Sequence, residues 1–215
     1  FQAEDGIRDR VLSLVGSEMC IRDSAMSDLI EIRWHGRGGQ GVVTAGKLLA
    51  ETAMGSGQYF QAFPDYGPER MGAPIRAFTR LSSQPITIHS QIDEPNVVLV
   101  LDPTQLGTVP VAEGLKEDGT LLVNTSMSPA EVREATGFRT GKTVTVDASH
   151  IAIAEMGREI TNTPMLGAFA RATGLFDIED LAEQLRAWFG KKISSEAIEA
   201  NVRAMRRAAE EVAEG

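Results

Sequence analysis

The chain has 215 residues, of which 42% are hydrophobic and 24% are charged, and its formal net charge at pH 7 is −9. These values are typical of one globular domain with a full core, and the acidic balance argues against general nucleic-acid binding. One cysteine, Cys20, is too few for a disulfide framework, a zinc knuckle or an iron–sulfur cluster. We also predict no metal site from the three scattered histidines. The apolar runs are far shorter than the roughly 20 residues of a membrane span, so a cytoplasmic protein is the simplest interpretation.

Residues 1–25 differ in character from the rest of the chain. Acidic residues precede the short apolar run at residues 11–16, which does not fit the basic start of a secretory signal. The stretch FQAEDGIRDRVLSLVGSEMCIRDS resembles a translated sequencing-adapter read joined to a gene. We therefore expect residues 1–25 to be a foreign or disordered extension without a packing role, and Met26 to be the natural start of a domain over residues 26–215. A genuine amphipathic leader is the alternative.

The most informative segment is residues 36–41, which match G-x-G-x-x-G between a predicted strand at 29–34 and a predicted helix at 42–54. Glycines in this context allow a tight turn and close backbone approach, and the helix start offers unpaired N–H groups to an anion. We predict that a phosphate-bearing ligand binds here. The residues concerned are Gly36, Arg37, Gly38, Gly39, Gln40 and Gly41. A glycine turn that only permits close packing of helix and strand is the alternative.

The second predicted strand covers residues 58–63 and ends at Pro64, with Asp65 beyond the proline. A dinucleotide-binding unit usually carries an acid at the tip of this strand for a ribose hydroxyl, so NAD is disfavoured. The loop that follows is dense in glycine and proline, yet it contains Tyr66, Glu69 and Arg70. Loops of this kind hold side chains for recognition, although a rigid turn with solvated side chains fits equally well.

Further along the chain, apolar runs alternate with helical stretches, which is typical of a doubly wound, mostly parallel α/β sheet. Residues 74–81 and 85–89 predict an antiparallel hairpin across the turn at 82–84. The other predicted strands are residues 96–101, 120–123 and 143–146, and the helices between them are residues 109–116, 128–134 and 147–156.

The C-terminal part is predicted to be helical. Thr163 is a candidate cap with Pro164 in the first helical position, Asp177 caps a helix that ends near Gly190, and Ser195 caps the last helix. The apolar stripes of the last two helices are interpreted as packing surfaces: Ile178, Leu181, Leu185 and Trp188 on one, and Ile198, Val202, Met205, Ala209 and Val212 on the other.

Ligands of open α/β sheets bind beyond the carboxyl ends of the strands. Polar residues follow several predicted strands, and we select Asp102, Asn124 and Asn162 as candidates for this cleft. Each residue taken alone is more often a helix cap, but together they converge on one edge. The sequence contains no nucleophile–base pair, no G-x-S-x-G and no P-loop, so we predict a binder of an anionic cofactor without catalytic residues of its own.

Several long motifs, in order, resemble the gamma subunit of pyruvate:ferredoxin oxidoreductase and related 2-oxoacid:ferredoxin oxidoreductases. They are HGRGGQGVVTAGKLLA, FPDYGPERMGAP, IHSQIDEPNVVLVLDPT and ITNTPMLGAFARATGL, and the resemblance covers residues 29–190. It implies a multisubunit enzyme that converts a 2-oxoacid, coenzyme A and oxidised ferredoxin to acyl-CoA, carbon dioxide and reduced ferredoxin.

The resemblance further implies alpha, beta and delta partner subunits that carry thiamine diphosphate and iron–sulfur clusters, with a gamma domain that holds coenzyme A against them. The four-cysteine module fused to gamma in some relatives is missing from this sequence, and the family does not explain the N-terminal extension. A free-standing Rossmann-like redox or regulatory module that binds a nucleotide is the alternative function.

Overall fold

A computed structural model describes residues 29–55, 57–65, 73–190 and 192–215. The predicted extension at residues 1–25 lies outside the described residues, as do the candidates Tyr66, Glu69 and Arg70. No helix in the described part of the chain is long and apolar enough to cross a membrane.

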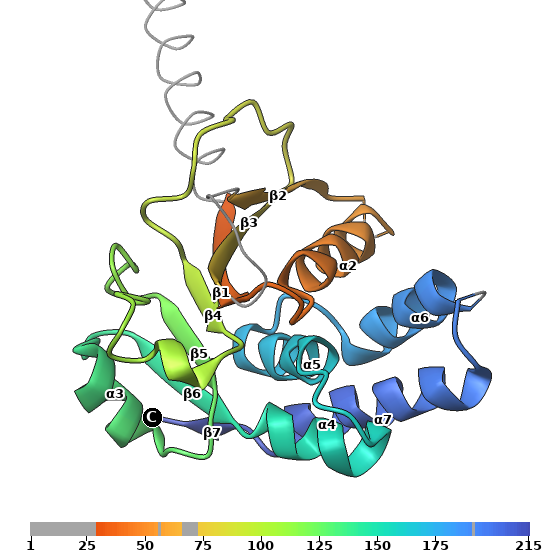
Figure 1. Cartoon of the computed structure of the whole chain (residues 1–215). Helices are drawn as coiled ribbons and strands as arrows, with labels where there is room; N and C mark the ends of the chain where they lie inside the picture. The colour runs from red at the N-terminus through yellow and green to blue at the C-terminus, as the bar shows by residue number, and fades with distance from the viewer. Residues whose placement is uncertain (1–28, 56, 66–72, 191) are drawn as a thin grey trace, which may run out of the picture.

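The described chain forms one seven-stranded sheet in the order β2-β3-β1-β4-β5-β6-β7 (Figure 1). Pairing is parallel from β1 through β4 and β5 to β6, whereas β3 is antiparallel to both β1 and β2, and β7 is antiparallel to β6. The mostly parallel α/β fold is therefore confirmed. The strands are β1 Ile30–Arg37, β2 Tyr59–Asp65, β3 Pro74–Ser82, β4 Val97–Val100, β5 Thr120–Asn124, β6 Lys142–Val146 and β7 Ala213–Glu214.

Helices cover both faces of the sheet, with α3 on one face and the other described α-helices packed on the opposite face (Figure 1). The central strand β4 is buried along its whole length because its alternate residues enter two different apolar clusters. The helices are α2 Val42–Gly55, the short 3-10 helix η1 Pro103–Gln105, α3 Pro129–Thr136, α4 Ala148–Met156, α5 Asn162–Thr173, α6 Ile178–Phe189 and α7 Ser195–Glu210.

Side-chain caps fix several helix starts; the predicted cap at Asp177 is present, whereas the other two predicted caps are wrong. Ser128, Asp147 and Asp177 accept backbone N–H groups at the starts of α3, α4 and α6. The cap of α7 is Ser194 and not Ser195. Thr163 is not a cap, because α5 already begins at Asn162 and the Thr163 hydroxyl donates to the Asn201 side chain instead.

Two predicted elements are wrong, and in both cases a buried arginine donates to backbone carbonyls in or next to the segment. Residues 85–89 are not a strand; Arg80 of β3 donates to the carbonyls of Ile88 and Gln91, and the antiparallel partners of β3 are β1 and β2. Residues 109–116 form turns and no helix, because Arg33 of β1 donates to the carbonyls of Val111 and Glu113.

The first two strands are longer than predicted. β1 continues to Arg37 because β3 stays paired with it as far as Pro74. β2 runs through Pro64 and ends at Asp65, and proline is tolerated there because β2 is an edge strand. An acid therefore does stand at the tip of the second strand, which corrects the prediction.

Candidate functional site

The glycine loop, residues 36–41, joins the end of β1 to the start of α2 and requires glycine at three positions. Gly39 and Gly41 have φ values of 97° and 75°, a region that side chains with a Cβ rarely adopt. Gly36 has a different reason, since a Cβ there would lie 2.5 Å from Cγ2 of Val42. The predicted turn is therefore present, with its backbone set by these three residues.

The start of α5 meets the same loop. A Cβ added to Gly41 would lie 2.6 Å from Nδ2 of Asn162, so the amide nitrogen of Asn162 packs directly against the loop. The side-chain Oδ1 of Asn162 accepts the backbone N–H of Thr163 at 2.9 Å, which holds the side-chain amide in this orientation. Asn162 was selected from the sequence, and the structure brings it to the glycine loop.

Two helix N-termini therefore converge at the loop, those of α2 and α5, which have 14 and 12 residues. Each helix start carries the positive end of a dipole and N–H groups without an intrahelical acceptor. Neither helix has an acidic residue in its first turn to occupy that position. The arrangement is suited to an anion such as a phosphate.

Asp102 follows β4 and connects this strand to the glycine loop. Its Oδ2 atom accepts Nε of Arg37 at 2.6 Å and Nε2 of Gln40 at 3.3 Å. Its Oδ1 atom accepts the backbone N–H and the hydroxyl of Thr104 at 2.9 and 2.6 Å. Burial alone would raise the pKa of Asp102, but the hydrogen bonds from Thr104 and Arg37 outweigh it and hold the pKa below its ordinary value.

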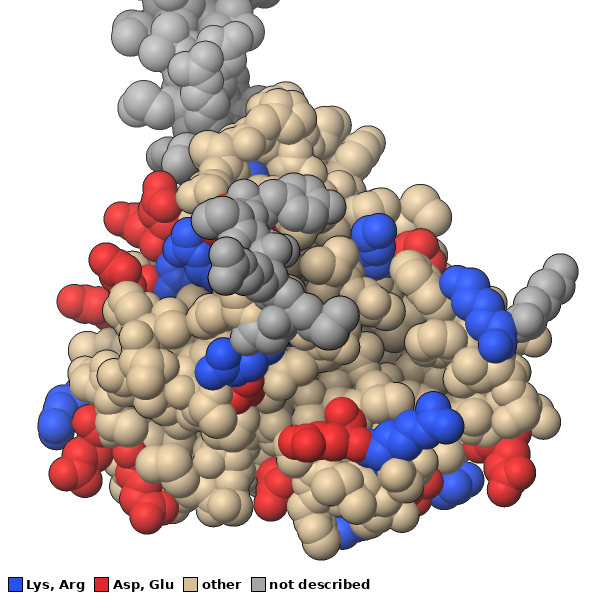
Figure 2. All heavy atoms as spheres, viewed as in Figure 1, with Lys and Arg blue, Asp and Glu red and all other residues tan. Residues whose placement is uncertain are grey.

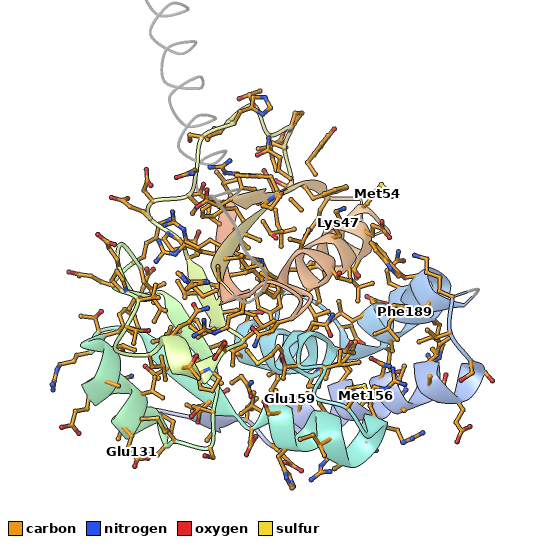
Figure 3. The ribbon with its side chains drawn as sticks, viewed as in Figure 1. Lys47, Met54, Glu131, Met156, Glu159 and Phe189 are labelled. Carbon is orange, nitrogen blue, oxygen red and sulfur yellow. The ribbon has the colours of Figure 1, made fainter. Side chains whose placement is uncertain are left out.

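Asn124 lies at the same sheet edge, where its side chain makes three hydrogen bonds within the chain. Its amide nitrogen donates to the Leu101 carbonyl at 2.8 Å and to the Ser149 hydroxyl at 3.0 Å, and its oxygen accepts the Ser149 backbone N–H. The Ser149 hydroxyl in turn donates to Glu159, which is labelled in Figure 3. Asn124 is 2% exposed and connects the end of β4 to the start of α4.

The sequence analysis did not select Arg33 and His35, a buried polar pair on β1. Arg33 and His35 are 5% and 2% exposed, and Nε of Arg33 donates to Nε2 of His35 at 3.1 Å. Burial, together with the charges of Arg33 and Arg76, lowers the pKa of His35 to about 3. These residues line a cavity of about 180 Å³ that also includes Gln105. The sequence signal was a charged residue at an alternating position inside an apolar strand.

Charges elsewhere are mixed. Figure 2 shows acidic and basic side chains interspersed over the visible face, without a continuous patch of one sign. Among the described residues, no group of three or more histidine, cysteine, aspartate and glutamate side chains is arranged to hold a metal ion.

Comparison with known proteins gives a consistent result. A family model described as pyruvate ferredoxin/flavodoxin oxidoreductase matches residues 31–211. Pyruvate synthase subunit PorC of Thermotoga maritima is 51% identical over 182 residues, which are 85% of this chain and 94% of that protein. The pyruvate/ketoisovalerate oxidoreductases common subunit gamma of Pyrococcus abyssi is 52% identical over 182 residues, 85% of this chain and 96% of that protein.

A solved structure agrees with the sequence comparison. The crystal structure of pyruvate oxidoreductase subunit PORC from Thermotoga maritima superposes with a TM-score of 0.78 and 46% sequence identity. The superposition covers 87% of this chain and 99% of that chain. The similarity therefore extends over nearly the whole length of the relative and includes both the sheet and the C-terminal helices.

Proposed function

We propose that this chain, which belongs to the pyruvate ferredoxin/flavodoxin oxidoreductase family, holds the phosphates of coenzyme A for the enzyme in which it assembles. The chain is a gamma subunit of a 2-oxoacid:ferredoxin oxidoreductase of the pyruvate synthase type. The family prediction from the sequence is therefore confirmed. The contact with coenzyme A, which this reaction converts to acyl-CoA, is the part that we propose.

The single observation that carries the proposal is the meeting of two helix starts at the glycine loop. The diphosphate of coenzyme A is a compact anion, and backbone N–H groups at a helix start bind such groups well. The Asn162 amide, packed 2.6 Å from where a Cβ of Gly41 would lie, adds a neutral side-chain donor. Among the described residues, nothing lies within 4 Å of a Cβ added to Gly39, so the described part of the chain leaves the backbone accessible to a ligand there.

The rest of the chemistry is proposed for partner chains. The described residues hold no cluster of metal-ligating side chains, and the sequence has a single cysteine, Cys20. Iron–sulfur clusters require several cysteine thiolates. We therefore propose that thiamine diphosphate and the clusters that reduce ferredoxin are carried by alpha, beta and delta subunits, with this chain presenting coenzyme A to them.

Gly39→Val in the assembled complex tests the proposal. The variant adds a branched side chain where we place a phosphate, and it should raise the Michaelis constant for coenzyme A about tenfold or more. That effect corresponds to the loss of one hydrogen bond to a charged group, roughly 1.5–3 kcal/mol. The Michaelis constant for the 2-oxoacid should stay unchanged, and the panel should include pyruvate and ketoisovalerate, since the Pyrococcus abyssi relative is named for both.

Gly57→Val is a matched control. Gly57 also has a positive φ, 76°, and no described residue within 4 Å of an added Cβ, but it lies just past the far end of α2. Both variants therefore introduce similar backbone strain, and only the variant at Gly39 should weaken the binding of coenzyme A. If the assembled Gly39→Val complex responds to coenzyme A like the wild type, the glycine loop serves packing alone.

A further inference from the structure

Arg37 is the charged residue of the glycine loop and would be the obvious ligand for a phosphate, yet it is already engaged by a carboxylate. Its Nε lies 2.6 Å from Oδ2 of Asp102, and its Nη2 donates to Oγ1 of Thr104 at 2.8 Å. The Asp102 side chain is only 7% exposed, whereas that of Arg37 is 35% exposed. An arginine paired with a largely buried aspartate contributes little net charge to a ligand.

The same carboxylate also fixes the far side of the loop. Gln40 donates to Asp102 through Nε2 at 3.3 Å, and its Oε1 accepts the backbone N–H of Arg37 at 2.8 Å. The backbone N–H of Gln40 donates to the Arg37 carbonyl at 3.1 Å. Asp102 therefore holds two loop residues that lie three positions apart, across a turn that they close between them.

Asp102 is itself firmly anchored. Thr104 gives it two hydrogen bonds from within the η1 turn, at 2.9 and 2.6 Å. The next residue of that turn, Gln105, donates to the Gly36 carbonyl at 2.5 Å. The segment that follows β4 is thus attached to the glycine loop at its first residue through Gln105 and at two later residues through Asp102.

We propose that Asp102 is the positioning residue of the glycine loop, and that Arg37 acts by neutralising Asp102 and does not itself bind the phosphate. In this arrangement the phosphate ligands are the backbone N–H groups of the loop and of the helix starts. A bare carboxylate beside them would repel the phosphate, and the Arg37 guanidinium cancels that charge. This inference rests on the proposed function, because it assigns roles within the same coenzyme A site.

Asp102→Asn distinguishes phosphate binding by Arg37 from loop positioning by Asp102, because the two roles predict opposite changes in the affinity for coenzyme A. If Arg37 bound the phosphate directly, removing the aspartate charge would release the guanidinium and tighten the binding of coenzyme A. If Asp102 positions the loop, the same change weakens coenzyme A although a negative charge has been removed. An asparagine has one acceptor oxygen, so it cannot accept from Thr104 and from Arg37 and Gln40 together; either the loop residues lose their acceptor or the side chain loses its anchor.

The experiment compares Asp102→Asn, Arg37→Ala and the double variant in the assembled complex. We expect Asp102→Asn to raise the Michaelis constant for coenzyme A about tenfold, with kcat at saturating coenzyme A within about twofold of wild type. Arg37→Ala should raise the Michaelis constant further, because it leaves the Asp102 carboxylate without its guanidinium partner. The double variant should recover to the level of Asp102→Asn, since both changes break one network and the charge is gone.

Hydrogen–deuterium exchange gives a readout that does not depend on turnover. The peptide that spans residues 36–43 should exchange faster in Asp102→Asn than in wild type. The matched control is Asp177→Asn, which removes the carboxylate that caps α6 and should change neither this peptide nor the response to coenzyme A. If Asp102→Asn prevents assembly, Gln40→Leu breaks one arm of the network and should raise the Michaelis constant in the same direction.

Three results would overturn the assignment: a lower Michaelis constant for coenzyme A in Asp102→Asn, a double variant as impaired as Arg37→Ala, or no effect of any of these variants. The proposed function is tested separately by Gly39→Val. An effect of Gly39→Val without one of Asp102→Asn removes the positioning role and leaves the coenzyme A site in place. An unaffected Gly39→Val complex removes both.

Discussion

His35 should make the stability of this chain fall as the pH drops below neutrality. The ring is 2% exposed and accepts a hydrogen bond from Nε of Arg33 at 3.1 Å, so the native state holds it in the neutral form. Burial, followed by the charges of Arg33 and Arg76, lowers its pKa to about 3, against about 6.5 in an unfolded chain. Between these values the unfolded state binds a proton that the native state does not.

The free energy of unfolding therefore decreases with falling pH through this window, by about 1.4 kcal/mol per pH unit from this residue. Between pH 7 and pH 5 the loss is about 2 kcal/mol. Urea unfolding at the two pH values measures it, with His35→Gln as the variant, because a glutamine oxygen can still accept from Arg33 and does not titrate. The difference between wild type and His35→Gln removes the contribution of carboxylates common to both.

His150→Gln is the matched control for the substitution itself, since it makes the same histidine-to-glutamine change at an exposed position on α4. If wild type and His35→Gln lose the same stability between pH 7 and pH 5, the His35 ring titrates normally in the folded chain. The assignment of a neutral His35 ring as the acceptor of the Arg33 Nε–H group would then be incorrect.

Three further predictions concern the free energy of unfolding, measured by urea denaturation. Gly167→Ala should destabilise the fold by about 3 kcal/mol or more, because a Cβ there would overlap the Met205 carbonyl oxygen where α5 packs on α7. Glu31→Ala should cost roughly 3–5 kcal/mol, since it leaves Arg80, 1% exposed, without its carboxylate partner. Ser128→Ala should cost only about 1 kcal/mol, the value of one helix cap; a loss as large as that of Gly167→Ala would contradict the capping box of α3.

Local patterns in the sequence predicted the parts of the fold that depend on neighbouring residues. The strand, glycine turn and helix around residues 36–41 are present because steric limits at Gly39 and Gly41 act within a few residues. The cap at Asp177 is equally local. The continuous apolar run of β4 predicted a strand buried on both faces, and both apolar clusters contain its residues.

Features that depend on distant partners were not predictable in this way. Arg37 was a plausible phosphate donor by its position in the loop, but its partner Asp102 lies 65 residues away in the chain. Arg33 removed the helix expected at residues 109–116 by binding carbonyls about 80 positions away, at Val111 and Glu113. Buried charge needs compensation from any group within reach, and the fold decides which groups those are.

The order of the strands separates this sheet from that of a dinucleotide-binding unit. An acid, Asp65, does end the second strand, so its expected absence was the wrong reason. However, β3 is inserted between β1 and β2, which places β2 two strand spacings from the strand that leads into the glycine loop, roughly 10 Å. Asp65 is also occupied by Arg76 and Gln91, at 2.7 and 3.0 Å. The second strand therefore does not bring an acid to the glycine loop, as it does in a dinucleotide-binding unit, and the acid that does lie there, Asp102, already accepts from Arg37 and Gln40.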